Sequence, residues 1–213
     1  MSRKKLFDFI LQRNSDFIEI GGGEGDLCVE LLNAGCKFIL YVEPDYKKFR
    51  VARRKLFPIH FQNKDISRID FSLINPCSDS VTVIMQDVIE HISKNKLRVF
   101  FLKLSKIYSR IYFLGRTPNL KSPFGLRNSF GDNSHIYRFT DNSLKSFLKD
   151  LGFNYIFIKN ENYKITGITS FFRYFPYLLV IFIISIIFSI VFGSWEGLLS
   201  PNIVFQAQKI IDK

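Results

Sequence analysis

Cysteine and histidine are scarce in this chain, and neither follows a ligand or disulfide pattern. Cys28, Cys36 and Cys77 form no C-x-x-C pair and no disulfide framework, and no secretory signal precedes the first predicted strand. We therefore expect the folded domain to lie in a reducing cytoplasm. The histidines His60, His91 and His135 lack the spacing of metal ligands, so the sequence predicts no metal site.

Acidic side chains are also in deficit, since 19 Asp and Glu face 30 Lys and Arg and give a formal net charge of +11. Much of this charge lies in three clusters, Arg3-Lys4-Lys5, Lys47-Lys48-Phe49-Arg50 and Arg53-Arg54-Lys55. Nucleic acid, an anionic membrane surface and a phosphate-bearing substrate are the partners that such charge favours. Because no RNA-binding module is recognisable at either end, nucleic acid is the least favoured.

The most informative motif is rich in glycine. Glu19-Ile20-Gly21-Gly22-Gly23-Glu24-Gly25 overlaps the end of the apolar-rich stretch from Asp16 to Ile20, which predicts a buried strand. A glycine turn between a strand and a helix lets a ligand approach bare backbone, and it aims helix N-terminal N–H groups at that ligand. The position three residues after Gly23 is Asp26, so the dinucleotide pattern G-x-G-x-x-G is not met. The turn suits a smaller, zwitterionic nucleoside.

A carboxylate follows the second predicted strand at a matching distance. Phe38 to Val42 ends at Glu43, about 20 residues beyond the glycines, where an α/β nucleotide fold places an acidic residue on ribose hydroxyls. The turn and this carboxylate together resemble the class I S-adenosylmethionine-dependent methyltransferases, whose first motif is acidic-x-G-x-G-x-G. The resemblance implies a doubly wound α/β fold with a mainly parallel seven-stranded sheet and an antiparallel last strand. It implies S-adenosylmethionine as the cofactor, with the binding residues Glu19, Gly21, Gly22, Gly23, Gly25 and Glu43.

Two further segments extend the resemblance. Asp65 matches the family's acidic residue after the third strand, which hydrogen-bonds the adenine amino group, and Ile66 follows it. After a predicted fourth strand from Val81, Gln86 would line the methionine end of the cofactor beside Asp87. The stretch Asp87-Val88-Ile89-Glu90-His91 resembles a segment usually written x-V-L-E-H. That segment is shared chiefly with methyltransferases like those of quinone biosynthesis and of glycan gene clusters.

Three residues invite a catalytic interpretation. Glu90 and His91 can form a general base, but we expect Glu90 to open a helix and His91 to cap or pack it. A polar loop follows the fifth predicted strand, Arg110 to Gly115, and lasts to Arg138, and the resemblance places it on the substrate side. Within this loop His135 is the predicted general base for an acceptor hydroxyl, because an ordinary histidine pKa near 6.5 leaves it neutral. The alternative that His135 only fixes the loop through hydrogen bonds stays open.

One long segment near the C-terminus carries no charge. Tyr174 to Trp195 is uncharged throughout, and Tyr177 to Gly193 reads YLLVIFIISIIFSIVFG. As a helix the uncharged segment would extend roughly 33 Å, which is enough to cross a hydrocarbon core of about 30 Å. Hydropathy alone therefore predicts a transmembrane helix and a membrane contact through residues 174–195.

The predicted fold conflicts with a single crossing. Phe153 to Lys159 and Asn202 to Gln208 predict the sixth and seventh strands of one sheet, and a crossing between them would leave an open sheet edge. We therefore expect the segment to return as a hairpin or to lie in the interface, with Pro176, Gly193 and Gly197 turning the chain at its ends. Alternatively, the last strand stays outside the sheet. A hydrophobic cap over the active site, or a dimer face, is the soluble alternative.

These expectations divide the chain into a methyltransferase domain at 1–160, with a short amphipathic helix at 5–12, a hydrophobic membrane-associated segment at 171–197 and a last strand within 200–210. The predicted function is methylation at the cytoplasmic face of a membrane, with O-methylation of a glycan or lipid-linked sugar intermediate as the leading reaction. O- or C-methylation in quinone biosynthesis is an alternative, and a tRNA methyltransferase stays open because of the charge. A non-catalytic cofactor-binding or membrane scaffold protein is the alternative of another class.

Overall fold

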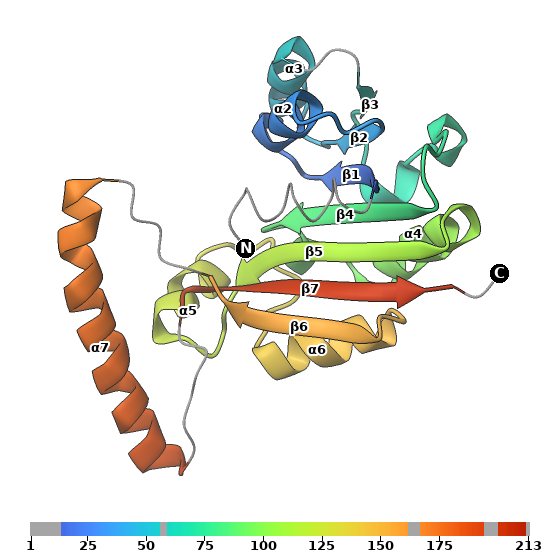
Figure 1. The fold of residues 1–213 in the computed structure, drawn as a ribbon. Helices are drawn as coiled ribbons and strands as arrows, with labels where there is room; N and C mark the ends of the chain where they lie inside the picture. The colour runs from blue at the N-terminus through green and yellow to red at the C-terminus, as the bar shows by residue number, and fades with distance from the viewer. Residues whose placement is uncertain (1–13, 56–58, 162–166, 194–199, 212–213) are drawn as a thin grey trace.

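The computed structural model describes residues 14–55, 59–161, 167–193 and 200–211. Its centre is one seven-stranded sheet with the strand order β3-β2-β1-β4-β5-β7-β6 (Figure 1). The strands are β1 (Asp16–Ile20), β2 (Ile39–Val42), β3 (His60–Gln62), β4 (Ser80–Gln86), β5 (Arg110–Pro118), β6 (Tyr155–Asn160) and β7 (Asn202–Ile210). The α-helices are α2 (Asp26–Asn33), α3 (Tyr46–Lys55), α4 (Lys94–Ile107), α5 (Pro123–Phe130), α6 (Asp141–Asp150) and α7 (Ile168–Phe192).

The sheet has the predicted doubly wound topology. Strands β3, β2, β1, β4 and β5 are parallel, whereas β7 inserts between β5 and β6 and runs antiparallel to both. The parallel strands end at one edge of the sheet, and the chain reverses direction across the sheet between β1 and β4. In such sheets ligands bind at this switch point, outside the carboxyl ends of the strands.

Apolar side chains from both faces of the sheet form two cores. Phe17 and Ile18 are adjacent on β1 and fully buried, but they belong to different cores because successive side chains in a strand point to opposite faces. One core includes the rings of Phe101 on α4, Phe113 on β5 and Phe153, whose centroids lie 4.9 to 5.6 Å apart. Burial on both faces explains the nearly continuous apolar runs of the central strands.

The segment after the fifth strand differs in part from the prediction. Strand β5 continues to Pro118, and the expected polar loop contains α5, which the sequence analysis missed. Ser122 accepts a hydrogen bond from the Phe124 backbone as the N-cap of α5, and Pro123 follows it, so both signals were in the sequence. Thr140 is the N-cap of α6, through a reciprocal capping box with Ser143.

Helix α7 is one continuous helix of 25 residues, so the predicted hairpin is wrong. Its segment contains no glycine to break it, and Pro176 lies inside the helix and not at its end. Gly193 ends it with a left-handed φ of 67°. The last strand joins the sheet, which excludes the alternative of a detached strand. In Figure 1 α7 stands apart from the sheet and its covering helices. The predicted helix at 5–12, as well as Trp195 and Gly197, lie outside the described residues.

Candidate cofactor and acceptor site

The glycine turn lies at the carboxyl end of β1 and needs glycine for backbone reasons. Gly21, Gly23 and Gly25 have φ values of 69°, 62° and 77°, in the left-handed region that other residues rarely adopt. A Cβ atom on Gly21 would lie 2.5 Å from the side chain of Val88, so the turn packs against the segment after β4. A Cβ on Gly23 would meet no atom of the described residues within 4 Å. The turn therefore presents bare backbone to open space at Gly23.

Gly22 is glycine for a steric reason. A Cβ there would lie 2.6 Å from the Glu19 carboxyl carbon and 2.7 Å from the ring of Tyr41. Glu19 is 5% exposed and accepts a hydrogen bond of 2.9 Å from Cys28 Sγ. Burial and the charge of Glu19 raise the pKa of the Cys28 thiol well above its usual range. Glu19, a predicted cofactor residue, thus contacts Gly22 directly.

Tyr41 on β2 and Glu43 directly after it bind the backbone of Gly23 through their side chains. The Gly23 N–H donates a hydrogen bond of 2.9 Å to Glu43 Oε2, and the Tyr41 hydroxyl donates one to the Gly23 carbonyl. Glu43 Oε1 accepts a further bond of 2.9 Å from the backbone of Asp45, and the residue is 4% exposed. A carboxylate has about four acceptor positions, so Glu43 keeps capacity for hydroxyl donors. Its predicted role on ribose hydroxyls stays a prediction.

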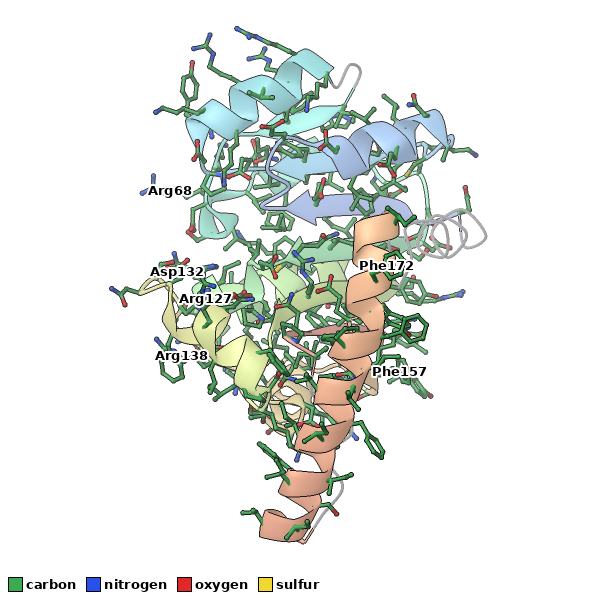
Figure 2. All side chains as sticks on the ribbon, turned by 90° about the vertical axis from the view of Figure 1, so that its left-hand side faces the viewer. Arg68, Arg127, Asp132, Arg138, Phe157 and Phe172 are labelled. Carbon is green, nitrogen blue, oxygen red and sulfur yellow. The ribbon has the colours of Figure 1, made fainter. Side chains whose placement is uncertain are left out.

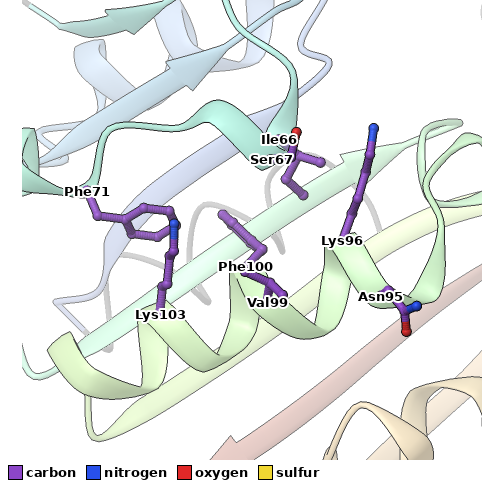
Figure 3. Close-up of a pocket in the computed structure, with 8 residues that line it drawn as sticks. All are labelled: Ile66, Ser67, Phe71, Asn95, Lys96, Val99, Phe100 and Lys103. Carbon is purple, nitrogen blue, oxygen red and sulfur yellow. The ribbon is translucent and has the colours of Figure 1, made fainter.

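Asp65 and Ile66 follow β3 and begin a short 3-10 helix. Asp65 caps this helix by accepting bonds from the Ser67 backbone at 3.0 Å and hydroxyl at 2.6 Å, and Lys96 Nζ lies 3.3 Å away. Partial burial alone would raise the pKa of Asp65, but these bonds hold it below its usual value. Ile66 is buried and borders a pocket between the segment after β3 and α4 (Figure 3). The pocket is lined by Ile66, Ser67, Phe71, Asn95, Lys96, Val99, Phe100 and Lys103.

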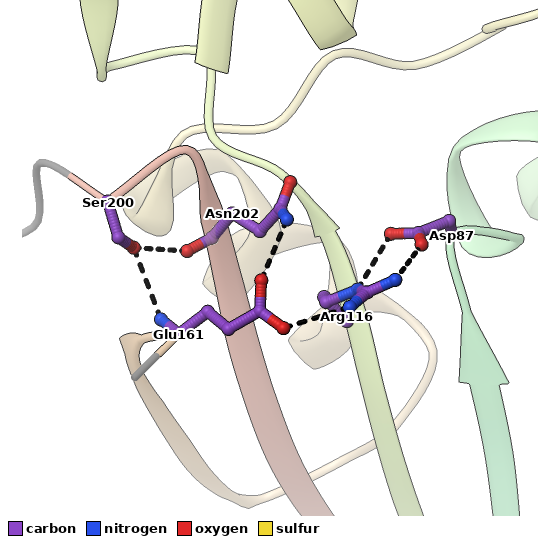
Figure 4. Close-up of polar contacts among 5 residues, drawn as sticks. All are labelled: Asp87, Arg116, Glu161, Ser200 and Asn202. Carbon is purple, nitrogen blue, oxygen red and sulfur yellow. Dashed lines mark hydrogen bonds and ion pairs between the residues drawn. The ribbon is translucent and has the colours of Figure 1, made fainter. Parts of the chain in front are cut away.

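Gln86 and Asp87 end β4 at the switch point, and both are exposed. Asp87 has a φ of 55° and binds Arg116 through two contacts, one of them an Nε–Oδ1 bond of 3.0 Å (Figure 4). Arg116 Nη1 also binds Glu161 Oε1 at 2.8 Å, and Asn202 donates to the other oxygen of Glu161 at 2.8 Å. These bonds join the ends of β4 and β5 to the two chain segments that flank α7. Sequence reasoning missed this network because its members are far apart in the chain.

The structure brings His135 to Glu90 and His91, from which it is separated by more than 40 residues in the sequence. Glu90 and His91 lie in a 3-10 turn at Ile89–His91, where an α-helix start was expected, and the rings of His91 and His135 lie 4.6 Å apart. Burial and the charge of Asp87 raise the pKa of Glu90 to about 7. His135 Nδ1 lies 3.1 Å from the Ser129 carbonyl, so His135 also ties its loop to α5.

Comparison with known proteins gives matches among solved structures alone. No family model matches the chain, and no curated protein matches it. A SAM-dependent methyltransferase from Archaeoglobus fulgidus is similar over 98% of this chain and 95% of its own, with a TM-score of 0.63 and 20% identity. The magnesium protoporphyrin IX methyltransferase of Synechocystis PCC 6803, with bound SAH, has a TM-score of 0.53 and 13% identity over 98% and 81%. The small RNA methyltransferase HEN1 has a TM-score of 0.59 and 17% identity over 98% and 26%.

At these identities the similarity shows the fold. The chain has the Rossmann-like fold of the class I SAM-dependent methyltransferases, with the antiparallel last strand that the sequence analysis predicted. The glycine turn, Glu43 and Gln86 lie at the carboxyl edge of its parallel strands, where this type of sheet binds ligands.

Proposed function

We propose that this protein is an S-adenosylmethionine-dependent methyltransferase that works at a membrane surface. The observation that carries the proposal is the Gly23 backbone, which faces open space beside the β1–β4 switch point. The Glu43 carboxylate binds its N–H group and the Tyr41 hydroxyl binds its carbonyl group. A turn built in this way lets a nucleoside approach the backbone closely. The fold of the SAM-dependent methyltransferases, one of them crystallised with bound SAH, supports this choice of cofactor.

The proposed cofactor contacts follow the edge of the sheet. The turn of Gly21, Gly22, Gly23 and Gly25 would hold the methionine end together with Gln86, while Glu43 would bind the ribose hydroxyls. Asp65 and Ile66 would contact the adenine, and Glu19 and Asp87 would hold the surrounding backbone in place. Methyl transfer then breaks the sulfonium S–CH₃ bond and forms a bond from the methyl carbon to an acceptor atom. In-line positioning supplies much of the rate when the acceptor is nucleophilic.

His135 is the proposed general base for an acceptor hydroxyl. Its side chain is 6% exposed, and Nε2 lies 3.9 Å from Asp132 Oδ2, a distance at which an imidazolium formed by proton transfer would be stabilised. If His135 is the base, His135→Ala should leave cofactor binding intact and reduce turnover. Unchanged turnover in that variant would remove the role.

Helix α7 supplies the proposed membrane contact. Its stretch Tyr174–Val191 has a mean hydropathy of 2.5, and 6% of it is buried against the protein. Large apolar side chains are exposed along the helix, among them Phe172, Leu179, Ile187 and Ile190. A helix that is apolar all round is stable inside a protein core or within lipid, and α7 has little protein around it.

Strands β6 and β7, which precede and follow α7 in the chain, belong to one sheet, and this argues against a full crossing of the membrane by α7. Glu161 and Ser200, which flank the segment, are held together by a bond of 3.1 Å from the Glu161 N–H to Ser200 Oγ. A 25-residue helix is about 37 Å long, whereas the seven residues 193–199 reach at most about 25 Å. A chain of that reach does not return from the far side of a bilayer of about 40 Å to Ser200. We therefore propose that α7 lies along one membrane face, below the headgroups.

The face that carries α7 has further features suited to a membrane surface. Figure 2 shows α5 on the side of the molecule that carries α7, with Arg127 and Arg138 labelled there. Phe130 on α5 is 58% exposed and Ile136 is 56% exposed, and the Arg138 guanidinium lies 4.7 Å from the Phe130 ring centroid. Arginine beside exposed apolar side chains favours contact with anionic lipid headgroups. This arrangement would bring a lipid-borne acceptor to the loop that carries His135.

The leading acceptor is a hydroxyl of a glycan or lipid-linked sugar intermediate on the cytoplasmic face of the membrane. A quinone precursor that is methylated on oxygen or carbon is the alternative with the same membrane requirement. The test uses the detergent-purified protein with methyl-labelled S-adenosylmethionine and separate fractions of lipid-linked glycans, quinone precursors and soluble sugars. Label in the glycan fraction supports the leading reaction and label in the quinone fraction supports the alternative. Cofactor binding without label in any fraction would favour a non-catalytic cofactor-binding or scaffold protein.

RNA methylation is a second candidate, and helix α3 favours it. This helix carries six basic residues in ten, Lys47, Lys48, Arg50, Arg53, Arg54 and Lys55, and one structural neighbour is a small RNA methyltransferase. Binding to RNA through such a helix would weaken steeply with salt. Transfer of label to RNA, with an RNA affinity that falls at least about tenfold between 50 and 200 mM salt, would place this candidate first.

A further inference from the structure

Three potential metal ligands meet where the segment after β4 contacts the loop after α5. Glu90, His91 and His135 each offer one ligand atom, and these atoms all lie within 4.8 Å of one another. The backbone N–H groups of Ile136 and Tyr137 donate bonds of 2.9 and 3.0 Å to the Glu90 carbonyl, so the two chain segments are fixed against each other. The cluster is therefore part of the folded structure.

Glu90 is the member of the cluster that most needs a partner. The residue is 1% exposed, and within the described part of the chain neither carboxylate oxygen accepts a hydrogen bond of normal geometry, although the nearby Thr117 hydroxyl favours the ionised form and lowers its pKa. A buried carboxylate without a partner is costly, and such groups are normally paired or bind a metal. A cation at the cluster would compensate this cost.

Hydrogen bonds fix the tautomer of His135. Its Nδ1 lies 3.1 Å from the Ser129 carbonyl oxygen, which can only accept, so Nδ1 carries the hydrogen in this contact. In the neutral ring Nε2 then keeps its lone pair. A ring nitrogen that donates to a backbone carbonyl is the usual support of a metal-binding histidine.

Hydrogen bonds through Ser134 and Asp132 fix the tautomer of His91 as well. Ser134 Oγ donates a bond of 2.5 Å to Asp132 Oδ1, because a carboxylate is only an acceptor, and the same hydroxyl lies 3.0 Å from His91 Nδ1. With its hydrogen committed to Asp132, the hydroxyl accepts from Nδ1–H of His91. Nε2 of His91 is left with its lone pair, as in His135.

We propose that Nε2 of His91, Nε2 of His135 and the Glu90 carboxylate bind one divalent first-row transition-metal ion. Two imidazoles and one carboxylate form a ligand set used by zinc and by iron(II) sites that keep open coordination positions. Around an ion at about 2.1 Å, neighbouring ligand atoms lie roughly 3 to 3.5 Å apart, so ligand atoms at the 4.8 Å limit of the cluster would approach each other by at least about 1.3 Å on binding. This proposal replaces the expectation of no metal site, which rested on sequence spacing alone.

The place of the cluster suggests its task, and this step rests on the proposed methyl transfer. Val88, two residues before Glu90, packs against Gly21 of the cofactor turn. An ion at the cluster would bind the acceptor hydroxyl at an open position and lower its pKa. The hydroxyl proton then leaves to solvent, and the oxygen forms the new bond to the methyl carbon as the sulfonium S–CH₃ bond breaks. With the ion in place His135 would be a metal ligand, and the ion would take over the activation of the hydroxyl that the proposed function assigns to His135 as a base.

The test is calorimetric titration of the full chain, purified in detergent and freed of metal by a chelator, with Zn²⁺, Mn²⁺ and Mg²⁺ in turn. We expect one site per chain for a transition metal, and an affinity that falls at least about 100-fold in His91→Ala and in His135→Ala. His60→Ala is the matched control, since His60 is exposed and stacks on Phe38, and it should bind metal like the wild type. Absorption of bound Co²⁺ gives a second readout of imidazole ligation.

The outcomes separate the metal site from the proposed function. The metal site is overturned if the folded wild type binds no transition metal, or if His91→Ala and His135→Ala bind it with the affinity of the wild type. Circular dichroism of each variant confirms that it is folded, and Asn replacements at both histidines keep the test valid if an Ala variant unfolds. S-adenosylmethionine binding is titrated separately. Metal binding without cofactor binding would overturn the proposed function and leave the site standing.

Discussion

The Gly23 backbone N–H donates a hydrogen bond of 2.9 Å to Glu43 Oε2, so the residue that follows β2 holds the turn that follows β1. This bond joins two motifs that are 20 residues apart in the sequence. It gives Glu43 two tasks, since the same carboxylate is the proposed ligand of the cofactor ribose. Loss of Glu43 would therefore disturb the turn as well as remove a contact.

The first prediction concerns cofactor affinity. Glu43→Ala should weaken S-adenosylmethionine binding at least about tenfold, since hydrogen bonds to a charged group contribute about 1.5 to 3 kcal/mol. Gly23→Arg should abolish binding because the side chain would fill the open space at the turn. Calorimetric titration measures both, with Glu24→Ala as the control at an exposed neighbouring carboxylate. Wild-type affinity in Glu43→Ala would show that Glu43 does not contact the cofactor.

The second prediction separates the two causes for glycine in this turn. Gly22→Ala should destabilise the fold by about 1 to 3 kcal/mol, because its Cβ would overlap Glu19 and Tyr41 in a packed region. Gly23→Ala should destabilise it by about 1 kcal/mol, since it meets open space and suffers only from its positive φ. Urea unfolding of both variants gives the ranking. A larger loss in Gly23→Ala would contradict the steric explanation.

The third prediction is a pH dependence at a buried carboxylate. Tyr108 donates a bond of 2.9 Å to Asp16 Oδ2, and burial raises the pKa of Asp16 despite this bond. A raised folded-state pKa means that Asp16 contributes stability at pH values below its unfolded pKa, and that this stability falls as the pH rises through the folded value. Tyr108→Phe removes the hydroxyl that donates a hydrogen bond to the ionised Asp16 carboxylate. Its destabilisation should be about 1 to 3 kcal/mol at pH 7 and smaller near pH 3.5.

Urea unfolding at the two pH values measures this difference. Tyr112→Phe is the matched control, because Tyr112 is a buried tyrosine on β5 that belongs to the other core. An equal loss of stability at both pH values in Tyr108→Phe would mean that the hydroxyl does not support the ionised carboxylate.

The fourth prediction concerns the arginine that joins the strand ends. Arg116 binds Asp87 through two nitrogens and Glu161 through a third, and these bonds raise its pKa further. Lysine has one charged nitrogen and does not reproduce this fork, so Arg116→Lys should lose about 1 kcal/mol of stability. Arg110→Lys, at the exposed start of the same strand, is the control. The loss should shrink in 0.5 M salt because these side chains are partly exposed.

The fifth prediction concerns the membrane contact of α7. Ile183→Lys with Ile187→Lys should abolish flotation with anionic vesicles, since lysine is costly in the hydrocarbon region. The control is Val99→Lys with Leu102→Lys, at two apolar positions of α4 that are about as exposed. It should float like the wild type, and flotation of both double variants would rule out α7 as the membrane contact.

The orientation of α7 can be measured by cysteine labelling. In a Cys77→Ser background, single cysteines at Ile168 and Val191 should both react with an impermeant maleimide added outside vesicles, because both ends of the helix lie on one face. Protection of the Val191 position until the vesicles are lysed would show a spanning helix instead.

Local sequence patterns determined much of this protein. The glycine turn, the strand at Asp16–Ile20, the N-cap at Thr140 and the uncharged segment that became α7 all follow from properties of neighbouring residues. Backbone freedom, periodicity and capping act within a few residues, so they can be recognised in the sequence. The mainly parallel sheet with its antiparallel last strand followed from the resemblance that these local patterns supported.

Tertiary structure alone decided which distant side chains meet. No spacing rule links His91 to His135, or Arg116 to Glu161, because their contacts depend on how whole strands are placed in the sheet. The same holds for α7: hydropathy predicts a helix that crosses a membrane, whereas the pairing of β6 with β7 returns the chain to its starting edge. The sequence determined that this helix is apolar. The pairing of the strands before and after it determined where the chain leaves the sheet and where it returns.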